Sequence, residues 1–227
     1  MGIARTIFNS VAGTGVVGVA AWTIATRNAR FVPIQANDEI FKDPAYLRNN
    51  PFKNPTTQDL CVRRVPLKNI KPQLLEKEGK LAEAFCGSVW GGLGYTYQRY
   101  YLEKKYRSDP GTANQLWERR DLQNATYDVG TQITNHFEVV TKTPNSNTVR
   151  CGDTPHNTGV RASDGLFQMS ADVKEDEGVA EFGLKSVFFV GDKKIDGTSG
   201  PMPAHIEFLH RLYTKLWLET AVLRLQK

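Results

Sequence analysis

The chain has 227 residues, of which 40% are hydrophobic and 23% charged, with a formal net charge of +5 at pH 7. This composition excludes a largely disordered chain, and a length below roughly 250 residues predicts one domain with an appendage. The Lys and Arg residues after Asp38 are scattered among acids, so we expect no nucleic acid among the partners.

Residues 6–26 contain no charged side chain, although Arg5 and Arg27 flank them. Such a length can cross the hydrocarbon core of a bilayer as a helix. The span is only modestly hydrophobic, and an acid-free, Arg- and Ser/Thr-containing start is also typical of a mitochondrial import segment. We expect residues 1–30 to form a hydrophobic anchor or targeting helix of a single-pass protein of the endoplasmic reticulum or mitochondrial inner membrane.

Three glycines of this segment offer a competing interpretation. Gly13, Gly15 and Gly18 match the G-x-G-x-x-G pattern of a dinucleotide site, and Asp38 follows 20 residues after the last glycine. The context disagrees, because Pro33 interrupts the strand that should follow and no βαβ alternation continues. An anchor is therefore favoured, and a buried helix of a soluble domain is the remaining alternative.

The next segment, residues 31–58, contains several prolines and asparagines and shows no hydrophobic period. This composition predicts a linker or a loop that lies on the surface. We place the start of the folded domain at position 59, so that it spans residues 59–227. Its first expected element is a short strand over residues 60–67.

Two helices are expected between this strand and the later ones. Pro72 suits the first turn of a helix, and apolar residues follow it at helical spacing as far as Gly91. The tyrosine-rich segment 95–107 predicts a second helix. Its residues Tyr97 and Tyr101 lie one turn apart and are candidates for lining a ligand pocket, because each combines an apolar ring with a hydroxyl group.

Residues 131–140, 164–173 and 179–190 alternate between apolar and polar side chains, which predicts strands of an antiparallel sheet. Alternation places one set of side chains on a common face that would form the inner wall of a concave sheet. The residues expected to contact a ligand there are Phe137, Phe167, Met169, Phe182, Leu184, Ser186 and Phe188.

The last segment, from Pro203 to Lys227, is amphipathic and predicts a long helix. A stripe of leucines, Leu209, Leu212, Leu216 and Leu223, is expected to face the core. The order of elements predicts an α+β helix-grip fold, in which an antiparallel sheet wraps around the C-terminal helix, preceded by the N-terminal hydrophobic helix. Such a fold encloses an apolar space suited to a small hydrophobic molecule.

The loop over residues 149–165 holds the densest polar cluster of the chain. Its charged and imidazole side chains, Arg150, Asp153, His156, Arg161 and Asp164, are the candidate catalytic residues. Loops at the rim of a rigid scaffold often carry function, and these groups have the chemistry to polarise a carbonyl or bind an anion. The same residues are equally suited to form salt bridges that order the loop.

The cysteines and histidines give no sign of a metal or a disulfide framework. Cys61, Cys86 and Cys151 are odd in number and widely spaced, and no C-x-x-C pair occurs. His205 and His210 lie five positions apart, which turns them about 140° from each other on a helix. We expect free thiols, no metal and no cofactor.

Several segments resemble a known superfamily: TQITNHFEVV, VRCGD, DGLFQMSADV and AEFGLKSVFFVG, followed by LHRLYTKLWLETA. In their order they are similar to the START/polyketide-cyclase (SRPBCC) superfamily of helix-grip proteins. They resemble more closely small fungal proteins with an N-terminal hydrophobic anchor, some of which are encoded among natural-product biosynthesis genes. The resemblance implies a cavity for a lipid, quinone, polyketide or terpenoid, and it supplies no universal catalytic residue.

The leading hypothesis is therefore a membrane-associated protein that binds a hydrophobic metabolite and promotes its cyclisation or isomerisation without a cofactor, as a pericyclase or Diels-Alderase does. Its chemistry would come from holding a reactive conformer and polarising it with rim groups. The alternatives are a lipid or quinone carrier at the mitochondrial inner membrane and an accessory subunit of a membrane complex.

Overall fold

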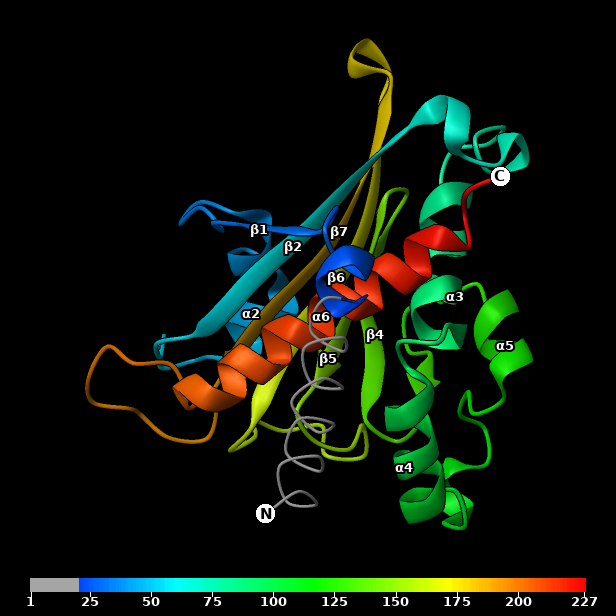
Figure 1. Cartoon of the computed structure of the whole chain (residues 1–227). Helices are drawn as coiled ribbons and strands as arrows, with labels where there is room; N and C mark the ends of the chain where they lie inside the picture. Colours follow the sequence, from blue (N-terminus) through cyan, green and yellow to red (C-terminus); the bar gives the residue numbers. More distant parts are fainter. Residues whose placement is uncertain (1–20) are drawn as a thin grey trace, which may run out of the picture.

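The computed structural model describes residues 21–227 (Figure 1). The strands are β1 (Arg30–Val32), β2 (Thr57–Pro66), β3 (Gln132–Ile133), β4 (Phe137–Thr143), β5 (Ser146–Cys151), β6 (Asp164–Lys174) and β7 (Val179–Phe189). The helices are α2 (Pro44–Asn49), α3 (Lys80–Gly91), α4 (Thr96–Tyr106), α5 (Arg119–Asn124) and α6 (Ala204–Leu223). The predicted α+β class, with an antiparallel sheet and a C-terminal helix, is confirmed.

The sheet has seven strands in the order β1-β2-β7-β6-β5-β4-β3, and all neighbours are antiparallel. Strand β2 pairs with the last strand along its whole length, from Thr57 opposite Phe188 to Pro66 opposite Val179. The helices α3, α4 and α5 are inserted between β2 and β3. The chain therefore returns to its first long strand before it enters α6.

The inner face of the sheet is covered by α3 and α6 (Figure 1). Phe167, Met169, Phe182 and Leu184 all point to this side and are buried, which confirms the predicted alternation of β6 and β7. Each such side chain contributes about 1.5–3 kcal/mol through removal of apolar surface from water. The main hydrophobic core thus lies between the sheet and these two helices.

The opposite face of the sheet carries a smaller core. Ile40 from the 3-10 turn Glu39–Phe41 and Ala45 from α2 pack there against Leu166, Val187 and Phe189. The prediction that residues 31–58 form a linker is wrong for this part, because β1 and α2 belong to the fold. A six-residue helix that begins at Pro44 is too short to leave a hydrophobic period in the sequence.

The leucine stripe of α6 is predicted to face the core, but a different side of the helix packs on the sheet. Its buried side chains are Thr214, Trp217, Leu218, Glu219, Ala221 and Val222. The leucines are turned outward: Leu209 is 57% exposed, Leu216 37% and Leu223 59%. Trp217 and the small Ala221 allow a large contact area at a short distance from the sheet, so this side packs more favourably than the leucines.

A single helix from Pro72 to Gly91 is not formed. Pro72–Leu74 is a 3-10 turn, and α3 begins only at Lys80. Gly79 has φ +84°, a left-handed conformation that ends the preceding segment and starts a new direction. The second predicted helix is present as α4.

Most of the predicted N-terminal anchor, residues 1–20, lies outside the described residues. Residues 21–25 are helical, and the following Thr26 and Ala29 are buried. Within residues 21–227, none of the helices combines the length and apolar character that crossing a bilayer requires.

Candidate functional site

Two of the candidate catalytic residues form a buried ion pair between neighbouring strands. The Nε and Nη2 atoms of Arg150 donate to the two carboxylate oxygens of Asp164 at 3.0 and 2.6 Å. The side chains are 5% and 0% exposed. Arg150 Nη2 also donates to the carbonyl oxygen of Gly159 at 2.6 Å. The pair therefore fixes the base of the loop between β5 and β6 and holds part of its backbone.

Arg161 also holds the backbone of this loop in place. Its Nε atom donates to the Asn157 carbonyl oxygen at 2.9 Å, and its Nη2 atom donates to the carbonyls of Thr154 and Asn157 at 2.9 and 2.7 Å. The residue is only 2% exposed. A guanidinium whose donors all face loop carbonyls orders the loop and has little capacity left for a ligand.

The remaining two candidates do not complete a catalytic arrangement. Asp153 accepts hydrogen bonds from the backbone N–H of Thr154 and from Asn157 Nδ2, and the bond from Asn157 is the main reason that its pKa is lowered. His156 is exposed. The structure thus brings Arg150, Asp153, Arg161 and Asp164 together in one loop, where an ion pair and hydrogen bonds to loop carbonyls order the backbone. Their catalytic role stays a prediction.

A second imidazole, that of His136, interacts with charged residues of this loop. Alternation along residues 131–140 predicts that its side chain shares the outer face of the sheet, in water, with Glu138. Its ring packs edge-on against Phe137, with centroids 4.8 Å apart. Burial lowers the pKa of His136, the charge of Arg161 lowers it further, and Asp153 partly opposes the shift. Thr134 and Asn135 have φ of 49° and 52°, and this left-handed turn before β4 decides the position of His136.

The predicted inner wall is a closely packed aromatic cluster. The Trp90 ring of α3 lies 4.7 Å from Phe137, 6.0 Å from Phe167 and 5.4 Å from Trp217, measured between centroids. Phe182 packs on Phe85 at 5.1 Å. These side chains contact one another, so the middle of the inner face is filled by the protein itself.

Methionine and cysteine side chains fill the neighbouring space of this core. The Sδ atom of Met169 lies 3.6 Å from the Sγ atom of Cys86. Cys61, Cys86 and Cys151 are all free and buried, as expected from their spacing. Their thiols are consequently part of the packing, and burial raises the pKa of Cys61 to about 12.

Ser186 and Phe188 lie towards one end of the inner face, next to charged residues. Ser186 is fully buried opposite Asp59 of β2, and its Oγ atom has no hydrogen-bond partner within the described residues. Asp59 is 6% exposed, and its Oδ2 atom lies 2.9 Å from His210 Nε2 of α6. The distance fits an ion pair although the angles do not fit a hydrogen bond. The Phe188 ring packs against His210 at 5.2 Å.

Tyr97 and Tyr101 do not line the inner face. They are 82% and 55% exposed, because α4 turns Leu102 towards the core and leaves these rings in solvent. Lys105 Nζ lies 5.9 Å from the centre of the Tyr101 ring. The tyrosine that does enter the core is Tyr95, whose ring stacks on Trp217.

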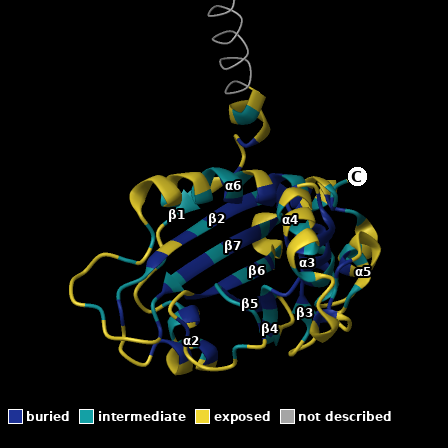
Figure 2. Cartoon of the chain, turned by 90° about the horizontal axis from the view of Figure 1, so that it is seen from below, coloured by how far each residue is buried: buried dark blue, intermediate teal, exposed yellow. Residues whose placement is uncertain are grey.

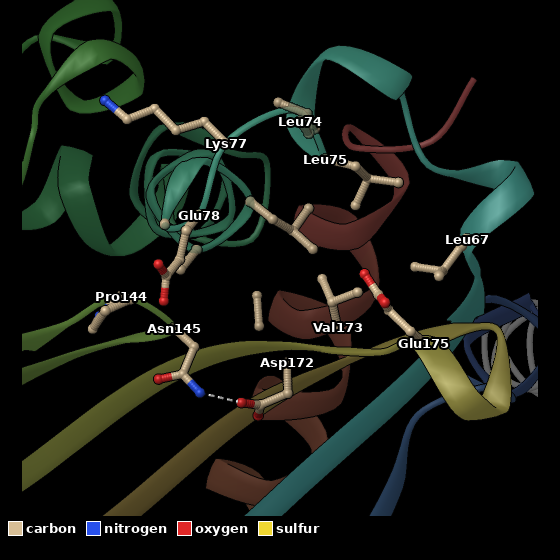
Figure 3. A pocket seen from close by; sticks show the side chains of 14 residues that line it. Leu67, Leu74, Leu75, Lys77, Glu78, Pro144, Asn145, Asp172, Val173 and Glu175 are labelled. Atoms are coloured by element: carbon tan, nitrogen blue, oxygen red, sulfur yellow. Dashed lines mark hydrogen bonds between the residues drawn. The ribbon is translucent and has the colours of Figure 1, made fainter.

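A pocket of about 540 Å³ opens at the other end of the inner face, near the hairpin between β6 and β7 (Figure 3). Its apolar walls are Leu67, Leu74, Leu75, Leu81, Ala82, Ala171 and Val173. They come from the 3-10 turn after β2, the segment before α3, α3 itself and β6. This volume is within the range of about 300–1,000 Å³ that is typical of small-molecule sites.

The rim of this leucine-lined pocket is polar. Figure 3 shows Glu78 and Glu175 on opposite sides of the pocket, and Asp172 bonded to Asn145. In residues 21–227, neither Glu78 nor Glu175 forms an ion pair. The pocket therefore combines an apolar interior with two carboxylates at its mouth.

None of the residues named as a ligand-binding candidate from the sequence lines this pocket. Leu74, Leu75 and Leu81 belong to the apolar stripe that predicts one helix from Pro72 to Gly91. A single helix would place all three side chains in the core. The break at Gly79 leaves Leu74 and Leu75 at the pocket instead. A glycine within a helical pattern is the one signal in the sequence that points to this break.

Comparisons with protein-family models, with curated proteins and with solved structures gave no match. The resemblance to the START/polyketide-cyclase superfamily is therefore carried by the order of elements and by the quoted segments alone.

Proposed function

We propose that the protein binds a small hydrophobic molecule in the leucine-lined pocket. The observation that carries this proposal is the apolar wall, which is built by residues from four separate parts of the chain and borders an open pocket of about 540 Å³. Burial of apolar ligand surface against such a wall contributes about 25 cal/mol per Å². A polar rim around an apolar interior favours a ligand with a hydrophobic body and a polar end.

The helix-grip interpretation supports the same class of ligand. The first long strand β2 closes against the last strand β7, the inserted helices follow β2, and α6 crosses the inner face. This order fits the fold that the resemblance implies. It makes a lipid, quinone, polyketide or terpenoid the ligand to test first, and a role in fungal secondary metabolism fits the same resemblance.

Membrane association is part of the proposal. The uncharged residues 6–26 are long enough to cross a bilayer, and a hydrophobic ligand partitions into the same bilayer. We place the protein at the endoplasmic reticulum or the mitochondrial inner membrane as a single-pass protein.

Cyclisation or isomerisation of the ligand is the second candidate, and the two rim carboxylates favour it. A carboxyl group beside an apolar wall can donate or accept a proton during rearrangement of an unsaturated molecule. Glu78 and Glu175 thereby replace Arg150, Asp153, His156, Arg161 and Asp164 as the groups to test. Without catalysis, the same pocket serves a lipid or quinone carrier, whereas an accessory subunit requires no ligand in it.

Replacement of Leu75 by Asp is expected to weaken binding of the neutral dye Nile red at least about tenfold, or roughly 1.4 kcal/mol, because a buried charge opposes an apolar ligand. Leu75 is already 37% exposed, so the fold should tolerate the change. The measurement is a fluorescence titration of the detergent-extracted full-length protein.

Leu47→Asp is the matched control, because Leu47 is an exposed leucine on α2 and lies outside the pocket. Equal affinity of wild type and both variants would place the dye elsewhere and refute the pocket as the ligand site. Loss of binding in both variants would refute it as well.

Glu78→Gln and Glu175→Gln test whether the bound molecule is altered. Cyclisation and isomerisation conserve mass, so molecules that co-purify are compared by mass, chromatographic retention and absorption spectrum. For an enzyme, we expect at least one variant to retain a molecule of equal mass but different retention and spectrum. An identical molecule in the wild type and both variants would contradict catalysis by these carboxylates and leave a carrier.

A further inference from the structure

The outward side of α6 carries several apolar side chains, which we call the outer stripe. Its members are Ile206, Phe208, Leu209, Leu212, Leu216 and Leu223. Phe208 is 62% exposed and Ile206 42%, in addition to the exposed leucines described above. Isolated exposed leucines are normal, but a row along one side of a helix indicates a contact surface.

The start of α4 extends this surface sideways. Tyr213 of α6 donates a hydrogen bond to the carbonyl oxygen of Gly94 at 2.7 Å, which holds this segment beside the helix. The neighbouring Leu93 is 71% exposed and Tyr97 82%. Leu93 and Tyr97 therefore add exposed apolar area beside the outer stripe of α6.

The N-terminal segment enters the fold on the same side. The backbone N–H groups of Asn28 and Ala29 approach the carboxylate of Glu219, which also forms a buried ion pair with Arg63 of β2. Residues 21–26 lie beyond α6 as seen from the sheet, and the exposed side of α6 faces them (Figure 2). The uncharged residues 6–26 thus join the fold next to the outer stripe.

The charges around the stripe are mainly positive. Arg27, in the turn that follows the N-terminal segment, and Arg30, at the start of β1, are exposed. Arg211 and Lys215 flank the stripe on α6, and the Arg211 guanidinium lies 4.2 Å above the Phe31 ring of β1. Of the two acids in α6, Glu219 is buried in its ion pair and only Glu207 remains near the surface. Such a border attracts anionic headgroups.

We propose that the outer stripe of α6 lies on an anionic lipid bilayer, with its apolar side chains in the boundary between headgroups and acyl chains. A helix with an apolar side and flanking cations binds in this way, parallel to the membrane plane. The inference rests on the proposed membrane association and adds the orientation: the inner core faces away from the bilayer and α6 faces it. The uncharged length of residues 6–26, and the place at which residues 21–26 join the fold, favour lipid over a second copy of the chain.

The test uses the full-length protein with one cysteine introduced at Leu209 or Leu216 and labelled with the fluorophore NBD. The native cysteines are buried and should react slowly. Labelled protein is mixed with vesicles of phosphatidylcholine and phosphatidylserine, some of which contain doxyl-labelled lipid that quenches NBD at close range. Leu47→Cys is the matched control, because Leu47 and Leu209 are both 57% exposed and Leu47 lies on the opposite side of the sheet.

We expect doxyl lipid to reduce the emission of labels at 209 and 216 at least about twofold, while the label at 47 stays unquenched. Vesicle binding without quenching at 209 and 216 would overturn the proposed orientation and leave the anchor intact. Absence of any vesicle binding would refute both. The labels could also be shielded before lipid is added. Shielding that does not depend on protein concentration would show that another part of the chain covers the stripe. Shielding that rises with protein concentration would show that a second copy covers it. Either result would overturn the lipid contact.

Discussion

Phe182→Ala is expected to lower the free energy of unfolding by about 3–5 kcal/mol, because truncation of a close-packed aromatic ring loses its transfer free energy and leaves a cavity. Phe182 is fully buried, lies opposite Ala171 in the sheet and packs its ring on Phe85 of α3. Chemical denaturation of the protein, followed by tryptophan fluorescence and circular dichroism, measures the change.

Phe208→Ala is the matched control, because it removes the same ring from a position that is 62% exposed. We expect its unfolding free energy to stay within about 0.5 kcal/mol of the wild type. A loss below about 0.5 kcal/mol for Phe182→Ala would mean that its ring borders open space, and the packed inner face described above would then be wrong.

Asp164→Asn should destabilise the protein by about 3–5 kcal/mol, because it leaves the Arg150 guanidinium buried without its counter-charge. The amide has nearly the shape of the carboxylate, so the change removes the charge and turns one hydrogen-bond acceptor of Arg150 into a donor without leaving a cavity. The double variant Arg150→Met/Asp164→Leu is expected to recover part of the loss, although the Gly159 carbonyl then lacks its donor. Unfolding free energies of Arg150→Met, Asp164→Leu and the double variant measure the coupling.

Glu177→Gln provides the comparison for an ion pair in water. Glu177 pairs with Arg64 on the surface, and its side chain is 50% exposed. We expect this change to leave stability close to that of the wild type. If Asp164→Asn were equally stable but altered the product formed from the ligand, the loop cluster would be catalytic and its description as a scaffold would fail.

Alternation of apolar and polar residues was sufficient to predict which side chains share a face in much of the sheet. Strict alternation in β6 and β7 places Phe167, Met169, Phe182 and Leu184 on one side, because side chains of a strand can only point to two faces. The same rule fails at His136, where two residues with positive φ precede β4 and change the direction of the chain. The pattern of side chains says nothing of such a turn until the backbone is known.

Helix α6 shows that a sequence pattern cannot always predict which side of a helix is buried. Its sequence contains two apolar sides, one with the leucines and one with Trp217, Leu218, Ala221 and Val222. A helical period identifies both but cannot choose between them, because the choice depends on the shape of the sheet surface that receives the helix.

Residue spacing within short segments was sufficient to predict the α+β class, the strands β6 and β7, the long C-terminal helix and the free cysteines. Tertiary structure alone decided that Arg150, Arg161 and Asp164 use their polar atoms on one another and on loop carbonyls. It also decided that Leu74 and Leu75 line a pocket and that Leu209, Leu216 and Leu223 of α6 face outward. These outcomes depend on contacts between segments that are distant in the chain. The role of each residue therefore depends on which residues of other segments contact it.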